Sequence, residues 1–397
     1  MADVTVLMIL RGVNAARLSW HGSPWVVAPS LDRFAAQATV LDRHYSPVID
    51  KDSAVSMLLP TSLIQSLHDR GHSLFWIASH KQIVPELFKK ISMDSVDEKV
   101  WSQAFAAVQL RSRGKNALIV VDLPFAEPPW TLRVREKDLY FPAATPEPTA
   151  SEPESEGWDE FEEPLEKVDE GTFSGSTDDF VDALPWEAEI PESVGSEDDL
   201  THLRLIETQA AAIGHVDAVA GAIFEQISAN VAVMVVGDRG LELGDHGATG
   251  DFNPQPWISR VNVPCIWYNP TGDGVPRRVL TPSSHHDVAV TLAKRCLVEL
   301  PDFDFAMDLT DLSLEDASGN INRSIVSIGG DGFRAIRTSE WSLMVADSGK
   351  TSLYSLPDDP WEVLDLASQR EDEVAELLLK LEKNPSSRSS KSAGRPA

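Results

Sequence analysis

Charged residues directly follow two of the most apolar segments of this chain. Arg11 and Gly12 come after the apolar run 6–10, and Asp238 and Arg239 come after a second such run. In an α/β protein, ligands and metals usually lie at the carboxyl ends of strands. A carboxylate there can hold a hard cation such as Ca²⁺, whereas an arginine repels one. The presence of both residue types raises the question of what chemistry these strand ends support.

Other groups with catalytic potential have simpler explanations. Cys265 and Cys296 lie in apolar contexts, which predicts buried, reduced thiols. Residues 285–287, His-His-Asp, stand at a predicted helix start, where we expect capping rather than metal binding. The glycine-rich segment 244–251 lacks the Lys and Ser/Thr of a phosphate loop, and no Gly-x-Ser-x-Gly elbow is present. The 11 tryptophans are expected in packing rather than in a sugar platform.

The charge of the chain is concentrated in one segment. The formal net charge is −28, and residues 147–199 hold 20 acidic residues against one basic residue, Lys167. A negative field argues against a nucleic-acid partner and against anionic membrane surfaces. No run reaches the length of a membrane helix, and the N-terminus lacks the features of a signal peptide. We therefore expect a cytoplasmic protein.

Apolar runs alternate with amphipathic stretches over most of the chain. This pattern predicts an α/β fold with a mostly parallel central sheet flanked by helices. Helices are expected at 29–40, 62–71, 102–114, 202–227 and 285–300, and strands at 6–10, 73–78, 117–121, 231–238 and 263–270. From about residue 322, short runs separated by turns predict a small C-terminal antiparallel sheet, followed by a helix at 371–383.

These patterns divide the chain into five segments. Residues 1–142 and 199–320 form the two parts of the α/β domain, 321–384 form the C-terminal subdomain, and 385–397 form a flexible tail. Residues 143–198 are rich in Pro, Glu, Ser and Asp, which predicts an acidic disordered insertion. The alternative is a helix-forming recognition segment around Trp158, Phe161 and Trp186.

The order of motifs resembles the sulfatase family of the alkaline-phosphatase-like superfamily. The stretches LSWHGSP, APSLDRFAAQATV and HYSP are similar to the start of such proteins, and VMVVGDRGLELGDHG resembles the late strand with its Gly-x-His-Gly. The stretches VNVPCIWYNPTG, HHDVAVTLAKRCLVELP and 335–367 match later features in order. The resemblance implies the sulfatase fold, with the acidic insertion as an addition. It also implies hydrolysis of sulfate esters by a formylglycine, made from Cys or Ser in a Cys/Ser-x-Pro-x-Arg motif, beside Ca²⁺.

The positions that would hold the nucleophile and the first metal ligands depart from this pattern. The paired metal aspartates of the family fall on Arg11 and Gly12. The nucleophile position falls on Asp50, which cannot become formylglycine, and the motif arginine falls on Ala54. The hydroxyls of Ser53 and Ser56 are expected to be helix-capping or surface groups.

Later family positions depart as well. The second metal pair falls on Asp238 and Arg239, so a cation again stands beside a carboxylate. Glu127 stands where the family has a histidine, and no lysine is present near Gly250 or Asp251. Remnants of the family site would be His80, Lys81 and His246.

The sequence therefore predicts a sulfatase-like, non-catalytic pseudoenzyme with a binding or regulatory role. No cofactor is expected, because the implied Ca²⁺ ligands are mostly lost. An anionic small ligand could bind at the degenerate site, and a protein partner could bind the acidic insertion. The alternatives are an active sulfuric or phosphoric ester hydrolase that uses other residues, and a structural partner subunit of an active sulfatase.

The most specific of these expectations concerns the two arginines at the strand ends. In one hypothesis Arg11 and Arg239 fill the vacated metal site and pair with Asp238 and Asp50. In the other, both side chains reach solvent.

Overall fold

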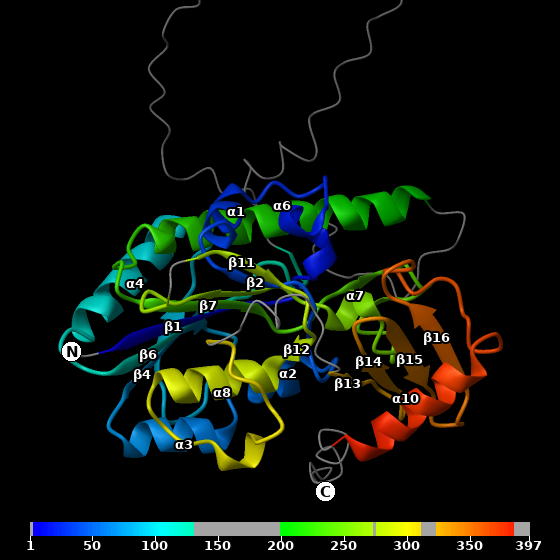
Figure 1. Ribbon diagram of the computed structural model, residues 1–397. Coiled ribbons are helices and arrows are strands. Elements are labelled where there is room, and N and C mark those ends of the chain that lie inside the picture. The colour runs from blue at the N-terminus through cyan, green and yellow to red at the C-terminus, as the bar shows by residue number, and fades with distance from the viewer. Residues whose placement is uncertain (1–2, 131–198, 273–274, 311–322, 385–397) are drawn as a thin grey trace, which may run out of the picture.

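Eight strands form the central sheet of the computed structural model, which describes residues 3–130, 199–272, 275–310 and 323–384. They are β1 (Val4–Leu10), β2 (Thr39–Leu41), β4 (Ser73–Ser79), β5 (Lys89–Met93), β6 (Ala117–Leu123), β7 (Ala232–Gly237), β10 (Cys265–Tyr268) and β11 (Arg277–Val279). Their order is β11-β2-β10-β7-β1-β6-β4-β5 (Figure 1). Strand β10 is antiparallel to both of its neighbours, and the other neighbouring strands of this sheet are parallel to one another.

Helices cover both faces of this sheet (Figure 1). One face packs against α1 (Pro29–Ala35), α4 (Glu98–Arg111) and α6 (Asp199–Phe224), and the other against α2 (Lys51–Leu58), α3 (Thr61–Asp69) and α8 (His285–Arg295). Successive side chains of a strand point to opposite faces, so β1 contributes Val6, Met8 and Leu10 to the first core and Leu7 and Ile9 to the second. An unbroken apolar run is thus what a doubly covered strand requires.

A second, smaller sheet lies at the C-terminal end of the chain. It is antiparallel, in the order β13 (Ile325–Ile328), β14 (Arg334–Arg337), β15 (Trp341–Val345) and β16 (Thr351–Ser355). Helix α10 (Glu371–Lys383) packs its apolar side, including Leu377 and Leu381, on this sheet (Figure 1).

Short elements connect these layers. They are β3 (His44–Tyr45) paired with β12 (Ser283–Ser284), β8 (Glu242–Leu243) paired with β9 (Thr249–Gly250), α7 (Ile258–Val261) and three 3-10 turns, Ala15–Arg17, Ser19–His21 and Pro301–Phe303.

The predicted fold class is confirmed, but some expected helices end early, such as that over 285–300, which ends at Arg295. The helix expected over 29–40 ends at Ala35, and Thr39 and Val40 belong to β2 instead. These β-branched residues pair with Trp267 and Ile266 of β10. A strand partner 226 to 228 residues later in the chain thus overrides the helical spacing. The acidic insertion 143–198, the tail 385–397 and the boundary at 320 lie outside the described residues, so those predictions stay open.

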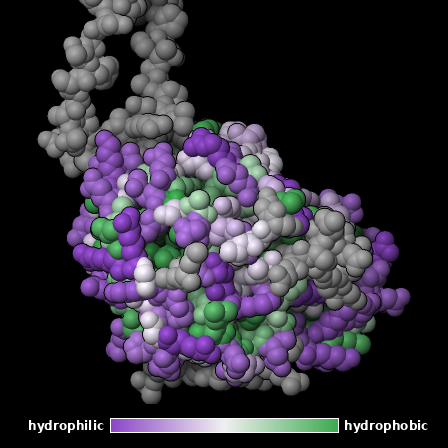
Figure 2. Space-filling view, turned by 60° about the vertical axis from the view of Figure 1, so that its left-hand side comes forward, coloured by the Kyte–Doolittle hydropathy of each residue, from purple (hydrophilic) through white to green (hydrophobic). Residues whose placement is uncertain are grey.

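The surface shows no single dominant apolar area on the face seen in Figure 2. That face is mainly hydrophilic, and its apolar side chains gather in small separate groups. Within the described ranges, no helix has the length and apolarity needed to cross a membrane.

Candidate functional site

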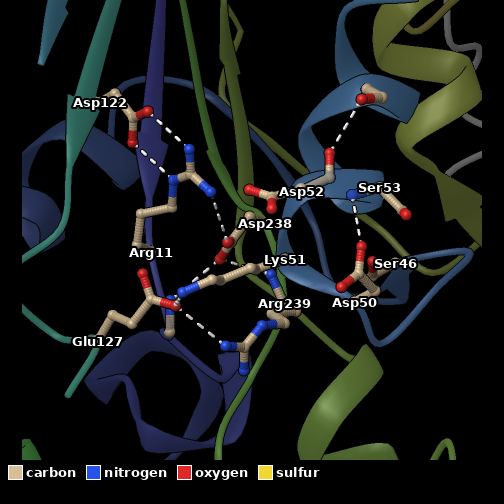
Figure 3. A network of polar contacts seen from close by, with 12 residues as sticks. Arg11, Ser46, Asp50, Lys51, Asp52, Ser53, Asp122, Glu127, Asp238 and Arg239 are labelled. Carbon is tan, nitrogen blue, oxygen red and sulfur yellow. Dashed lines mark hydrogen bonds and ion pairs between the residues drawn. The ribbon is translucent and has the colours of Figure 1, made fainter. Parts of the chain in front are cut away.

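The carboxyl ends of three adjacent strands bring two of the predicted pairs, Arg11–Gly12 and Asp238–Arg239, together with Asp122. Strand β1 lies between β6 and β7, so Arg11, Asp122 and Asp238 meet at one edge of the sheet. The apolar run of each strand is buried between the two layers of helices. The first charged residue after each run therefore lies where the strand leaves the apolar core. Figure 3 shows these side chains pointing toward one another.

Arg11 is held mainly by a residue that the sequence analysis did not identify. Its Nε and Nη2 donate to the two carboxylate oxygens of Asp122, both at 2.7 Å, and its Nη1 lies 3.4 Å from Asp238 (Figure 3). Arg11 is 5% exposed and Asp122 is fully buried. Burial lowers the pKa of Arg11, but the nearby carboxylates of Asp122 and Asp238 outweigh it and raise that pKa above its usual value. The guanidinium is therefore a permanent buried cation.

Asp238 is engaged by three hydrogen-bond donors. Its Oδ1 accepts the backbone N–H groups of Gly12 at 3.0 Å and Arg239 at 2.7 Å, and its Oδ2 faces Arg11. Burial raises the pKa of this carboxyl above its ordinary value, although Arg11 and Arg239 act in the opposite direction. Such a carboxylate has little capacity left for another ligand.

Arg239 lies in a second group of carboxylates. Its Nη2 donates to Glu127 at 3.1 Å, and its Nη1 lies 3.0 Å from Asp251, which also pairs with Arg260 at 2.9 Å. The Lys51 ammonium lies 3.6 Å from Glu127. Arg239 is 1% exposed. The expectation that both arginines reach solvent is therefore wrong, because carboxylates from other segments surround each guanidinium and compensate its burial.

Asp50 does not join either arginine, contrary to the pairing hypothesis. Its carboxylate accepts the Ser53 N–H at 2.8 Å and caps helix α2 (Figure 3). Burial raises the pKa of Asp50, but the hydrogen bonds from Ser53 and the charges of Arg239 and Lys51 outweigh it and lower that pKa. Ser53 and Ser56 are helix residues, as expected, and the Ser56 hydroxyl donates to the Asp52 carbonyl at 2.9 Å.

Gly12 has a backbone conformation that residues with a side chain rarely adopt. Its φ is +73°, and a Cβ built there would lie 2.8 Å from the Ala126 carbonyl oxygen. An aspartate could not stand at this position without a shift of the backbone. The turn itself, and not only the residue type, therefore disfavours an aspartate at the position that the resemblance assigns to a metal ligand.

The three predicted remnants lie in two places. His80 and Lys81 line the same cleft as Arg11, and His80 pairs with Asp94. His246 lies elsewhere: its ring stacks on Trp257 with centroids 3.8 Å apart, and its Nε2 bonds the Trp361 carbonyl at 3.0 Å. It therefore packs against the C-terminal subdomain. Ala54 is buried in α2 and provides no functional group.

The cleft above the strand ends has a volume of about 570 Å³. Arg11 and Glu127 lie in it, Lys51 and Lys81 provide cations, and Trp101 and Phe125 provide an aromatic wall. It opens between α2 and the loops that follow β4, β5 and β6, which is the usual ligand position in an open α/β sheet. The cleft is therefore the candidate binding site.

The residues at this edge do not fit the Ca²⁺ that the resemblance implies. In the ranges that the structure covers, no group of three or more His, Cys, Asp or Glu residues is arranged to hold a metal ion. Asp122 and Asp238 already bind a guanidinium, and Ca²⁺ needs about 6–8 oxygen ligands. The donor set is that of an ion-pair network, not of a metal centre.

Residues 285–287 have the structural role expected for them. Asp287 forms a capping box with Ser284, accepting its N–H at 2.6 Å, and also pairs with Arg323. The two thiols, Cys265 and Cys296, are buried and free, as predicted, and burial raises the pKa of each.

Comparisons with known proteins were informative only at the level of structure. No family model matches the chain, and no curated protein matches it in sequence. The solved structure of BT4656 in complex with its substrate D-glucosamine-2-N,6-O-disulfate superposes with a TM-score of 0.74 at 13% identity, over 98% of this chain and 100% of the other. The putative sulfatase yidJ from Bacteroides fragilis gives a TM-score of 0.66 at 16% identity, over 98% of this chain and 97% of the other.

The chain has the sulfatase fold. A phosphonate monoester hydrolase from Silicibacter pomeroyi shares it, with a TM-score of 0.68 at 14% identity over 96% of this chain and 95% of the other. At these identities the likeness concerns the architecture. The side chains of this sulfatase-fold chain must be judged by their own geometry.

Three residues of the network were missed or undervalued by sequence reasoning. Asp122 is the one carboxylate in the otherwise apolar strand β6, and such an isolated charge is a usable signal, because a buried carboxylate requires a partner. Asp251 was noted only as a position without lysine. Arg260 had no sequence signal, since only the fold brings it to Asp251.

Proposed function

We propose that this chain is a non-catalytic sulfatase-fold protein that uses its cleft for binding. The observation that supports it best is the pairing of Arg11 with Asp122 and Asp238, which places a fixed cation among the carboxylates at the strand ends. Hydrolysis of a sulfate ester needs a strong nucleophile and a polarising cation at the reacting group. Asp50, at the nucleophile position, caps a helix and is oriented toward Ser53.

The proposal predicts that the chain hydrolyses neither aryl sulfates nor aryl phosphates nor phosphonate monoesters. Turnover should equal that of heat-inactivated protein with or without Ca²⁺, Mg²⁺ or Mn²⁺, because Asp50, at the nucleophile position, caps helix α2 and Arg11 occupies the strand end where a polarising cation would be needed. The phosphonate monoester hydrolase from Silicibacter pomeroyi is the positive control for the phosphonate arm of the assay.

Saturable turnover that Asp238→Ala or Asp50→Ala abolishes would overturn the proposal in favour of an active hydrolase. Co-purification of the inactive chain with an active sulfatase, with activity that depends on both, would instead identify a structural partner subunit.

The cations that line the cleft favour the binding of a small anionic ligand. Lys51 is half exposed, and its ammonium lies 3.6 Å from Glu127, beyond ordinary hydrogen-bond distance. Its donors are therefore available to an anion. Asp52, Asp94 and Glu127 also line the cleft and weaken the positive field, so the expected dissociation constant for inorganic sulfate is on the order of 1 mM.

We expect Lys51→Ala to weaken sulfate binding about 5–10-fold, which corresponds to about 1 kcal/mol for a hydrogen bond from a half-exposed ammonium. Calorimetric titration at low ionic strength measures this. The matched control is Lys89→Ala, because Lys89 is an exposed lysine at the other end of β5 and does not line the cleft. Equal effects of the two substitutions would reject the cleft as the anion site.

A further inference from the structure

The ion pairs at the strand ends form one nearly continuous network. Four carboxylates alternate with four cations: Asp122, Asp238, Glu127 and Asp251 with Arg11, Arg239, Arg260 and Lys51. The formal charges cancel, so the network is complete without an added ion. Its innermost part is the group formed by Arg11 with Asp122 and Asp238, which has almost no access to solvent.

The two innermost carboxylates have different supporting partners. Asp122 depends on Arg11 for two hydrogen bonds, and its remaining contact is the Trp76 indole N–H at 3.3 Å. Asp238 has two backbone N–H groups besides Arg11. Without the guanidinium, two buried carboxylates would remain near one another with no side-chain cation between them, because Arg239 reaches Glu127 and Asp251 instead. An uncompensated pair of this kind is strongly unfavourable.

We propose that Arg11 is a built-in counter-cation that replaces a divalent metal, and that its removal turns Asp122 and Asp238 into a divalent-cation site. Carboxylate oxygens are the ligands of hard cations, and water would supply the rest of the coordination shell. The guanidinium thus makes the fold independent of metal and also keeps metal out. This inference concerns electrostatics at the strand ends and holds whether or not the cleft proves to be non-catalytic.

Thermal unfolding of wild type, Arg11→Ala and Arg337→Ala, with CaCl₂ or NaCl at matched ionic strength, tests the proposal. Arg337 is the matched control, because it is equally buried and pairs through Nε and Nη2 with a single carboxylate, Glu362. Both substitutions are expected to lower Tm. At about 10 mM Ca²⁺, Tm should rise by about 3 °C for Arg11→Ala alone, as for a site with a millimolar dissociation constant.

A second readout reports binding directly. Tb³⁺ replaces Ca²⁺ in oxygen sites and emits when a nearby indole is excited, and Trp76 contacts Asp122. Sensitised emission should increase in Arg11→Ala above the level of wild type and Arg337→Ala. The acidic segment is common to all three proteins and sets the same background.

Two further variants complete the test. Arg11→Lys keeps the charge, so its Tm should not respond to Ca²⁺. If Arg11→Ala is insoluble, Arg11→Gln removes the charge while it keeps N–H donors toward Asp122. A Ca²⁺-dependent rise in the Tm of wild type, or a charge-removed variant that responds no more than Arg337→Ala, would overturn the proposal.

Discussion

Asp122→Asn is expected to destabilise the chain by about 3–5 kcal/mol, the usual cost of removing one partner of a buried ion pair. The substitution leaves the guanidinium of Arg11 inside the core with Asp238 alone, at 3.4 Å. It also removes the negative charge that strengthens the two short hydrogen bonds from Arg11. A neutral amide can accept only one of these hydrogen bonds. Equilibrium unfolding in urea, followed by far-UV circular dichroism, measures the loss.

Glu376→Gln is the control for this experiment. Glu376 pairs with Lys380 at 2.9 Å on helix α10, and the two side chains are 67% and 31% exposed. Exposed pairs contribute about 0–1 kcal/mol, so this substitution should cost little. If Asp122→Asn is as mild as Glu376→Gln, the buried pair is not a main support of the strand ends.

The stability of the chain should fall steeply between about pH 6.5 and pH 4 because several buried histidines resist protonation. Burial lowers the pKa of His285 to about 3, and burial lowers the pKa values of His21 and His286 to about 4. Burial and the neighbouring His285 hold the pKa of His44 well below its ordinary value. In the unfolded chain these rings take up protons near pH 6.5, so acid favours unfolding.

Hydrogen bonding explains why the His44–His285 pair has no place for another proton. The Asp238 carbonyl accepts from His285 Nε2 at 2.7 Å, so Nδ1 of that ring must be the acceptor for His44 Nε2 at 3.1 Å. His44 Nδ1 then accepts from the Ser283 hydroxyl at 2.9 Å. A proton added to His285 Nδ1 would face the N–H of His44, and one added to His44 Nδ1 would face the hydroxyl hydrogen of Ser283.

The sign and size of the effect follow from these values. The stabilisation is complete above pH 6.5 and is lost as the pH falls, by about 2–3 kcal/mol per histidine at pH 4.5. The raised pKa values of Asp238, Asp217 and Asp42, which burial causes, oppose this trend and reduce the slope. The pKa of His246 is raised, because Glu242 outweighs burial, so its contribution is present at low pH and is lost as the pH rises.

Urea unfolding at a series of pH values from 7.5 to 4.5 checks this prediction. The double variant His44→Gln/His285→Gln should show a smaller dependence of unfolding free energy on pH than wild type. A free energy of unfolding that stays constant between pH 7 and pH 5 would contradict the prediction.

The sequence was sufficient for the fold class and for most of the elements. The apolar run 117–121 could be recognised as a strand because a strand buried on both faces is mainly apolar, and α10 occupies the residues expected for it. The helix over 29–40 was partly wrong, because pairing of Thr39 and Val40 with a distant strand decided their conformation.

The departures from the sulfatase motifs were also visible in the sequence alone, because they are matters of residue type. Arg11 cannot ligate a cation and Asp50 cannot become formylglycine in any fold. What those residues do instead was decided by the tertiary structure. Pairing between charges depends on which strand ends become neighbours, and Asp122 lies 111 residues from Arg11 in the chain while Asp238 lies 227 away. The sequence therefore determined what this edge of the sheet lacks, and only the folded sheet, by burying the guanidinium against carboxylates from β6 and β7, decided what stands in its place.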